Sequence, residues 1–299
     1  MKRLIIFLLA FSCAASVSAQ EDIPQYNPNS LNPIPRYEHL YKVKVWREMR
    51  LDEKQNKGFF ARSNEITKLI MDAVKSGELA DIYKNDSLTT KISKEAMLKS
   101  LQMQEGTKPD PWQPDFDYYA SDPVDFNGTY YKAKRDNRGK SPDASPDDWV
   151  QDKSIGQGTF AMPQQLAALT IVEDMIFDKR RSRLYYDIQS ITIIWPGDKG
   201  QPLGGDLPVA TFKYKDLVQV FRNHPDDAIW FNRYNTAENK NYEEAFLLRL
   251  FHGVIQKTEN PDNETLSDLY SNRPYSERVW AREWEEMKLM EREHNLWEY

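Results

Sequence analysis

The sequence predicts an α+β fold: an antiparallel β-meander with flanking helices, plus a small β-rich insertion and a helical C-terminal part. Two long segments of alternating polarity, 171–177 and 184–195, are followed by a third at 209–214, and short connections between such segments are typical of a meander. Other segments carry apolar residues at helical spacing. The segment 108–152 is rich in proline and turn residues, which indicates an insertion.

Composition places the chain among ordinary globular proteins and argues against several partners. It has 299 residues, of which 40% are hydrophobic and 29% charged, enough for one large domain or two small ones. Only 12 residues are glycine, which counts against glycine-rich nucleotide loops. The formal net charge of −6 argues against binding to a nucleic-acid backbone, so no nucleic-acid partner is expected.

Residues 1–19 have the pattern of a cleavable signal peptide. Two cations at positions 2 and 3 precede a short apolar run at 4–11, and Val17-Ser18-Ala19 forms a suitable cleavage site. The run is too short for a membrane anchor, which needs about 20 apolar residues. We therefore expect export of a mature chain that begins at Gln20.

The single cysteine, Cys13, lies inside this signal peptide. An acylated lipoprotein cysteine is the alternative, but the preceding Ala10-Phe11-Ser12 departs from the Leu-small-small triplet usual at such sites. Cleavage after Ala19 would leave no thiol in the mature chain, which would rule out disulfides, cysteine-bound zinc and thiol catalysis.

The N-terminal part divides into an arm and the first part of the main domain. Residues 20–35 are rich in proline and asparagine, which indicates a floppy terminus or an arm along a neighbouring molecule. Residues 36–107 form an αβ part with these expected elements: a strand around 41–45, a helix capped by Ser63 and ended by Gly77, and a short helix that starts at Ser93.

The remaining chain holds the insertion and the second part of the main domain. Residues 108–152 form the β-rich insertion, in which Asn127-Gly128 is a typical hairpin turn. Residues 153–299 form the C-terminal part of the main domain. Three helices are expected there beside the meander: one from Pro163 through Leu169, one after the capping pair Asn241 and Glu244, and one from Ser276 to His294.

The final helix carries a stripe of large apolar side chains. Trp280, Trp284 and Met287 follow one helical face, and the expected environment of the two tryptophans is the core. Arg282 and Glu286 are four residues apart, which predicts a charged pair on the solvated face.

No catalytic or cofactor-binding pattern stands out. Segment 154–161 contains G-x-G-x-x-A, but no convincing strand precedes it and Pro163 follows too soon for a dinucleotide site. The four histidines are scattered, and the E-x-x-H sequence at 291–294 is half of a di-iron motif. Asp226-Asp227 leaves a hydrolase site open, although a solvated turn is the commoner meaning of such a pair. We expect no enzyme, no cofactor and no metal site.

The insertion also has a specific resemblance. Its sequence Asn127-Gly128-x-Tyr130-Tyr131-Lys132-Ala133, with the later Gly139, Pro142 and Trp149, resembles the small chitin-binding type of carbohydrate module. Aromatic faces stack on sugar rings, so the candidates for carbohydrate stacking are Trp112, Tyr130 and Trp149. The alternative is that these side chains form the miniature core of the insertion.

Several stretches form a combined pattern over most of the mature chain. The first are Val45-Trp46-Arg47, 51–57 and Phe59-Phe60; then come 173–179, Ser182 and the strand 188–196. The C-terminal matches are Phe231-Asn232, Asn235, 242–246, Arg249, Phe251, Ile255, Lys257 and Asn260. Together these residues resemble the GldN/PorN family of gliding-motility proteins in the type IX secretion system of Bacteroidetes. The insertion departs from the family pattern.

The resemblance implies a periplasmic, non-enzymatic assembly component, peripheral to the inner face of the outer membrane. It implies a GldK/PorK-type lipoprotein and a GldM/PorM-type motor component as partners, together with self-association in a ring. A secreted glycan-binding protein that acts through 108–152 is the alternative. Candidate partner contacts for the assembly function lie near the two ends of the mature chain: Pro24, Tyr26, Pro33, Leu296, Trp297 and Tyr299.

Overall fold

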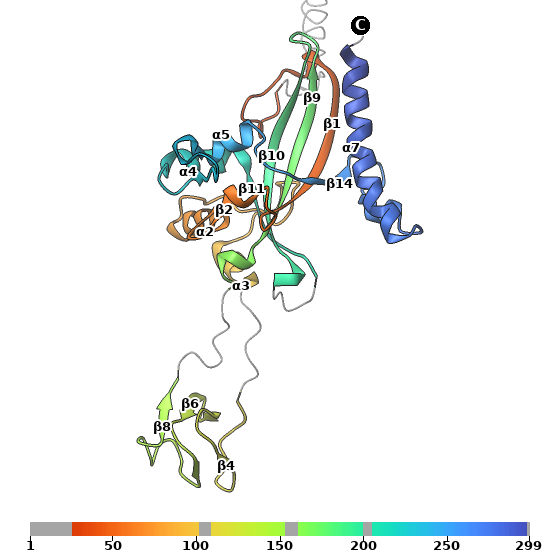
Figure 1. The fold of residues 1–299 in the computed structure, drawn as a ribbon. Coiled ribbons are helices and arrows are strands. Elements are labelled where there is room, and N and C mark those ends of the chain that lie inside the picture. Colours follow the sequence, from red (N-terminus) through yellow and green to blue (C-terminus); the bar gives the residue numbers. More distant parts are fainter. Residues whose placement is uncertain (1–25, 102–108, 153–160, 200–204, 298–299) are drawn as a thin grey trace, which may run out of the picture.

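One antiparallel sheet organises the main part of the chain. The computed structural model describes residues 26–101, 109–152, 161–199 and 205–297. The largest sheet has five strands in the order β11-β10-β9-β1-β14, and all neighbours are antiparallel (Figure 1). From one edge to the other they are β11 (Leu207–Lys213), β10 (Arg183–Trp195), β9 (Ala168–Asp178), β1 (His39–Arg50) and β14 (Val254–Thr258).

The strands β9, β10 and β11 follow one another both in the chain and in the sheet, which confirms the predicted meander and the α+β class. β1 pairs with β9 over its full length, from His39 opposite Asp178 to Arg50 opposite Ala168. β14 pairs with the other side of β1. The sequence-based prediction lacks β14, because five residues give too short a pattern to distinguish a strand from a loop.

Helices cover both faces of this sheet. Figure 1 shows α7 along the outer side of β1 and β14, with most of the other helices on the opposite side. The helices that pack on the larger core are α2 (Ile66–Ser76), α3 (Lys94–Ser100), α4 (Tyr214–Asn223) and α5 (Tyr242–Leu247). The other face carries α6 (Leu266–Leu269) and α7 (Tyr275–Trp297). No helix in the described part of the chain is long and apolar enough to cross a membrane.

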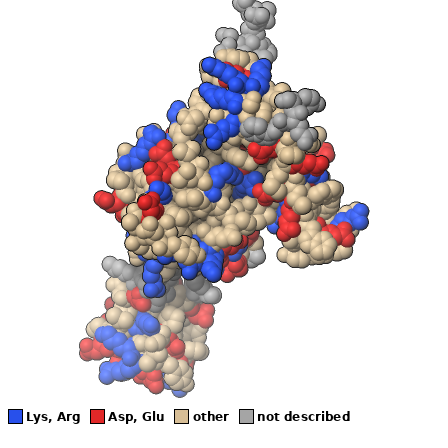
Figure 2. All heavy atoms as spheres, turned by 45° about the horizontal axis from the view of Figure 1, so that its top comes forward, with Lys and Arg blue, Asp and Glu red and all other residues tan. Residues whose placement is uncertain are grey.

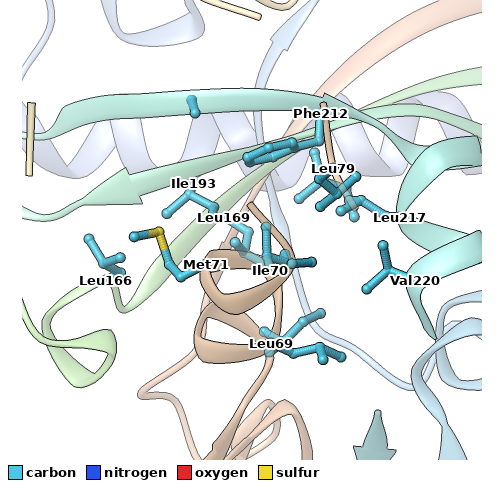
Figure 3. Close-up of a cluster of buried hydrophobic side chains, with 14 of the residues drawn as sticks. Leu69, Ile70, Met71, Leu79, Leu166, Leu169, Ile193, Phe212, Leu217 and Val220 are labelled. Atoms are coloured by element: carbon cyan, nitrogen blue, oxygen red, sulfur yellow. The ribbon is translucent and has the colours of Figure 1, made fainter. Parts of the chain in front are cut away.

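The larger core lies between the sheet and the first group of helices. In Figure 3, Ile70 and Met71 of α2 lie close to Leu169 and Ile193 of the sheet, and all four side chains are buried. α2 can pack in this way because its apolar residues recur at three- and four-residue spacing, which gives the helix one apolar face. Gly77 ends the helix as predicted, with a φ of 88° that favours glycine.

One of the two helix caps predicted in the N-terminal part is wrong. α2 begins at Ile66, and Ser63 lies before it with a φ of 70°. The backbone N–H of Ser63 donates to Glu65 Oε1, so the local turn places Ser63 outside the helix. Ser93 is confirmed as the N-cap of α3, because its hydroxyl accepts a hydrogen bond from the N–H of Ala96.

The helix predicted from Pro163 through Leu169 is also wrong. Only a short 3₁₀ turn, η3 (Pro163–Gln165), forms there, and β9 already begins at Ala168. The carbonyl of Ala167 accepts the N–H of Leu51 at 2.8 Å, which joins this segment to the end of β1. The pairing of the two segments therefore overrides the local helical signal.

Helices in the last third of the chain differ from expectation as well. α4 follows β11 without a loop, whereas the prediction placed only the end of a strand at Tyr214. Asn241 is confirmed as the N-cap of α5, since its Oδ1 accepts from the N–H of Glu243. α5 ends at Leu247, earlier than expected. Ser276 is not a cap, because α7 begins one residue before it.

The segment 109–152 forms two small sheets with a hydrophobic cluster of their own. β5 (Pro123–Phe126), β6 (Thr129–Ala133) and β8 (Trp149–Gln151) form one sheet, and β4 (Asp117–Tyr118) and β7 (Asn137–Arg138) form the other. The turn at Asn127-Gly128 has φ values of 52° and 78°, which confirms the predicted hairpin. Figure 1 shows these strands apart from the main sheet.

The two chain segments that flank the insertion meet at the main part of the protein. The N–H of Ala161 donates to the carbonyl of Leu101 at 2.8 Å.

The remaining short strands are β2 (Phe60–Ala61), β3 (Asn64–Glu65), β12 (Ile229–Trp230) and β13 (Lys240–Asn241). The remaining 3₁₀ turns are η1 (Arg36–Glu38), η2 (Lys57–Phe59), η4 (Gly197–Lys199) and η5 (Thr236–Glu238).

Candidate interaction surface

A buried cluster of charged side chains joins the sheet to the C-terminal helix. Glu173 of β9 has no exposed surface, and its carboxylate accepts from Arg47 Nε at 2.6 Å and from Arg249 Nη1 at 2.7 Å. Arg47 of β1 also donates from Nη1 to Glu286 Oε1 of α7 at 2.8 Å and to the carbonyl of Gly253 at 3.2 Å. The cluster therefore fixes which side of α7 faces the sheet.

Electrostatics keep the guanidinium of Arg47 ionised. Burial alone would lower the pKa of Arg47, but the charges and hydrogen bonds of Glu173 and Glu286 outweigh it and raise that pKa. The guanidinium of Arg249 also lies 4.1 Å from the ring centre of Tyr186. Buried charges of this kind are tolerated because each has partners of opposite charge.

The inward face of α7 differs from the one that its sequence predicts. Ala281 and Leu289 are buried against the body of the protein. Arg282 donates from Nη2 to Ser267 Oγ at 3.0 Å, and Glu286 accepts a hydrogen bond from Arg47. The prediction of a solvated Arg282/Glu286 pair is therefore wrong, because both side chains turn toward partners on other elements.

The opposite face of α7 carries its large apolar side chains into solvent. Trp280 is 63% exposed and Trp284 is 54% exposed, and Met287 is exposed as well. The expectation that the two tryptophans pack in the core is wrong. We call Trp280, Trp284 and Met287 the aromatic stripe. Exposed apolar groups of this size are typical of surfaces that bind other proteins.

A shallow hollow of about 360 Å³ lies beside the aromatic stripe. Lys288 extends over the stripe, with its Nζ 4.1 Å from the ring centre of Trp284. The side chains around the hollow are both apolar and charged: Tyr270, Arg273, Glu277, Trp280, Ala281 and Trp284. An apolar centre with a charged rim is the usual anatomy of a protein–protein contact.

Three of the partner contacts predicted near the chain ends have side chains within the described residues. Tyr26 and Pro33 are exposed near the start of the described chain, and Leu296 is half-buried near the end of α7. Pro24 and Tyr299 lie outside the described residues. α7 includes Trp297 as its last residue, but the side chain of Trp297 is outside the description.

The described end of the proline-rich arm packs on this same chain. Asn27 donates from Nδ2 to Gln189 Oε1 at 2.7 Å, and Gln189 donates to Asp187 Oδ2 at 2.6 Å. Lys42 pairs with Asp174 Oδ2 at 2.8 Å beside them. These side chains border a polar hollow of about 600 Å³, so residues 27–30 are fixed on the sheet and are not a floppy terminus.

The predicted sugar-stacking residues of the insertion have different environments. Trp149 is only 3% exposed, packs edge-to-face on Tyr118 and donates its Nε1–H to the carbonyl of Lys140. Its ring therefore belongs to the small core and offers no free face to a sugar. Trp112 and Tyr130 are partly exposed.

The sequence patterns that could carry chemistry have the following places in the described part of the chain. Within the described residues, no group of three or more His, Cys, Asp or Glu side chains is placed to hold a metal ion. Asp226-Asp227 lies in an exposed turn. The G-x-G-x-x-A sequence at 154–161 falls outside the described residues except for Ala161.

Arg47 and Glu173, which lie at the centre of the cluster that positions α7, were absent from the predicted site residues. Glu173 and Asp174 place two carboxylates in the buried strand β9, and a carboxylate in a buried strand requires a cationic partner. That placement is a signal in the sequence, but the partners Arg47 and Arg249 lie 126 and 76 residues away. The sequence does not show which cations fold against Glu173.

Comparison with known proteins assigns the chain to a family. No curated protein matches it. Residues 34–298, which include the sheet, the buried charge cluster and α7, match the family described as gliding motility associated protein GldN. The match covers most of the chain and agrees with the resemblance found in its sequence, so the chain belongs to the GldN family, whose members are components of the gliding-motility and type IX secretion machinery.

Proposed function

We propose that this protein is a periplasmic, non-enzymatic assembly component of the type IX secretion machinery, peripheral to the inner face of the outer membrane. It binds a GldK/PorK-type lipoprotein, contacts a GldM/PorM-type motor component and associates with copies of itself in a ring. Membership of the GldN family supports a role in this machinery. The signal-peptide pattern predicted at residues 1–19 supports a periplasmic location.

The observation that carries the proposal is the aromatic stripe. Two exposed tryptophans forgo the large hydrophobic stabilisation that burial of each aromatic side chain would give. A partner that covers them would recover this stabilisation. Here the buried charge cluster holds α7 with the stripe outward. The stripe is therefore available to a partner without rearrangement, which lowers the entropic cost of binding.

A ring needs more than one contact surface on each subunit. A head-to-tail contact uses two different surfaces, and a further partner needs a third. We assign the aromatic stripe to the lipoprotein partner. The residues near the chain ends (Pro24, Tyr26, Pro33, Leu296, Trp297 and Tyr299) remain proposed additional contacts.

The test is co-purification of the lipoprotein partner with a tagged Trp280→Ser/Trp284→Ser variant. We expect loss of the partner and of cargo secretion, with an unchanged thermal midpoint, because neither side chain is buried. Tyr234→Ser is the matched control, since Tyr234 is an exposed aromatic residue on another surface. If the lipoprotein still co-purifies fully with the stripe variant, the aromatic stripe is not the lipoprotein contact.

The compartment has a separate test. If residues 1–19 are a cleaved signal peptide, mass spectrometry of the protein from membranes will find Gln20 at the N-terminus. An intact Met1, or a lipid on Cys13, would contradict this part of the proposal.

Binding of glycans through 108–152 is the second candidate function. It is favoured by two exposed aromatic side chains in that segment, Phe116 and Tyr119, which the sequence-based prediction did not include. Sedimentation with insoluble chitin compares the whole chain with a chain in which 109–152 is replaced by a short Gly/Ser bridge. Glycan binding requires that only the whole chain sediments.

A further inference from the structure

The hairpin between β9 and β10 ends in a strongly basic loop. Lys179, Arg180, Arg181 and Arg183 occupy four of five consecutive positions, and all four are exposed on a chain of net charge −6. The hairpin reaches the upper end of the molecule in Figure 1. Figure 2 shows Lys and Arg side chains gathered at that end.

Hydrogen bonds hold this loop in one conformation. Asp178 has no exposed surface, and its Oδ1 accepts the backbone N–H groups of Arg180 at 2.8 Å and Arg181 at 3.2 Å. Its Oδ2 accepts from Arg181 Nη1 at 2.6 Å. Burial would raise the pKa of Asp178, but these donors outweigh it and hold the pKa below its usual value. The cations are thus displayed on a fixed turn.

The acidic partners of the loop lie beneath it. Within the described residues, the carboxylates paired with these four cations are Asp178 and Glu38, and both are buried. The side chains of Arg180 and Arg181 remain 71% and 51% exposed despite these pairs. Two negative charges inside and four positive charges outside leave the outer surface of the tip positive.

Exposed apolar side chains stand next to the basic loop. The N–H of Lys179 donates to the carbonyl of Glu38 at 2.9 Å, which places the start of β1 beside the tip. Tyr37 and Leu40 flank this point and are 60% and 56% exposed. The pairing with β9 shifts between His39 and Tyr41, so Leu40 lies in a bulge. Such bulges redirect a side chain away from the regular sheet.

We propose that this tip, made of Tyr37, Leu40 and residues 179–183, docks on the surface of a lipid bilayer that contains anionic headgroups. The lysines and arginines bind headgroup phosphates, and Tyr37 and Leu40 enter the interfacial layer. A positive outer surface beside two exposed apolar side chains matches the negative headgroups and the apolar interfacial layer of such a bilayer. A few cations with interfacial apolar side chains are sufficient for reversible membrane binding.

The test is sedimentation of the chain from Gln20 onward with vesicles, since this chain lacks the apolar run at 4–11. We expect binding to vesicles of phosphatidylethanolamine with phosphatidylglycerol, weaker binding as salt is raised, and little binding to phosphatidylcholine. Lys179→Ser/Arg180→Ser/Arg183→Ser should weaken binding by at least about tenfold. Arg181 is kept because it pairs with Asp178.

The matched control removes three exposed cations elsewhere: Arg62→Ser/Lys99→Ser/Lys215→Ser. Equal losses in the two variants, or binding of the original chain to neutral and anionic vesicles alike, would overturn the proposal. Absence of vesicle binding would also overturn it. If the tip variant binds vesicles normally but no longer co-purifies with the lipoprotein, the tip is a protein contact instead. Trp280→Ser/Trp284→Ser should bind vesicles normally, which separates this inference from the proposed function.

Discussion

Glu173 is the buried carboxylate at the centre of the charge cluster, and it acts on α7 through Arg47. It is fully buried and receives two arginines, so Glu173→Gln leaves Arg47 and Arg249 without their shared counter-charge. We expect a loss of about 3–5 kcal/mol in the free energy of unfolding, measured by urea denaturation. Asp72→Asn is the control, because its pair with Lys75 is exposed and should be worth less than about 1 kcal/mol. Similar losses in both variants would show that the buried cluster is not specially important.

Asp187 should make stability depend on pH. Burial raises its pKa to about 6 from 3.8, and the neighbouring Asp174 adds to the shift, although Gln189 and Lys42 oppose it. The folded state therefore holds this proton more tightly than the unfolded state. The stabilisation is complete below about pH 4 and is lost as the pH rises through about 6.

Asp187→Asn removes this titration and keeps the shape of the side chain. At pH 7 the variant should be more stable than the original chain by about 1–2 kcal/mol, whereas at pH 4 the two should be nearly equal. Urea unfolding at both pH values measures the difference. A gain of the same size at both pH values would mean that ionisation of Asp187 is not its cause.

At the scale of elements, the insertion is expected to be separable. Its strands have their own hydrophobic cluster, and the hydrogen bond from Ala161 to Leu101 brings the two ends of the surrounding chain together. Replacing 109–152 by a short Gly/Ser bridge should therefore leave a cooperative thermal transition, followed by circular dichroism. Insoluble protein, or loss of cooperativity, would show that the main core needs the insertion.

At the scale of the whole molecule, separate cores should unfold separately. The clusters on the two faces of the main sheet share its strands, whereas the cluster of Tyr118, Val124, Ala133 and Trp149 has none of them. Scanning calorimetry should then show two transitions, with the smaller one absent after deletion of 109–152. A single transition for the whole chain would indicate coupling between the insertion and the sheet.

Much of the fold could be predicted because its signals are local. The strand signals at 171–177 and 184–195, the Asn127-Gly128 turn and the Gly77 helix end each depend on neighbouring residues alone. Predictions were weaker where a segment is short or continuous with its neighbour. β14 and α4 were missed for these two reasons.

The sequence by itself determined the antiparallel meander and the helical end of the chain, because these follow from residue order and periodicity. The family was indicated by a resemblance of sequence stretches and shown by the family match. The orientation of α7 was decided only by tertiary structure. Both faces of the helix carry apolar side chains, so the sequence does not show which face is buried. Trp280 and Trp284 lie on one face, and Ala281, Arg282 and Leu289 lie on the other. Arg47 and Glu173 are buried in the sheet and need counter-charges, so Glu286 turns inward and the tryptophans face solvent. Those partners come from strands far away in the chain, and only folding brings them together.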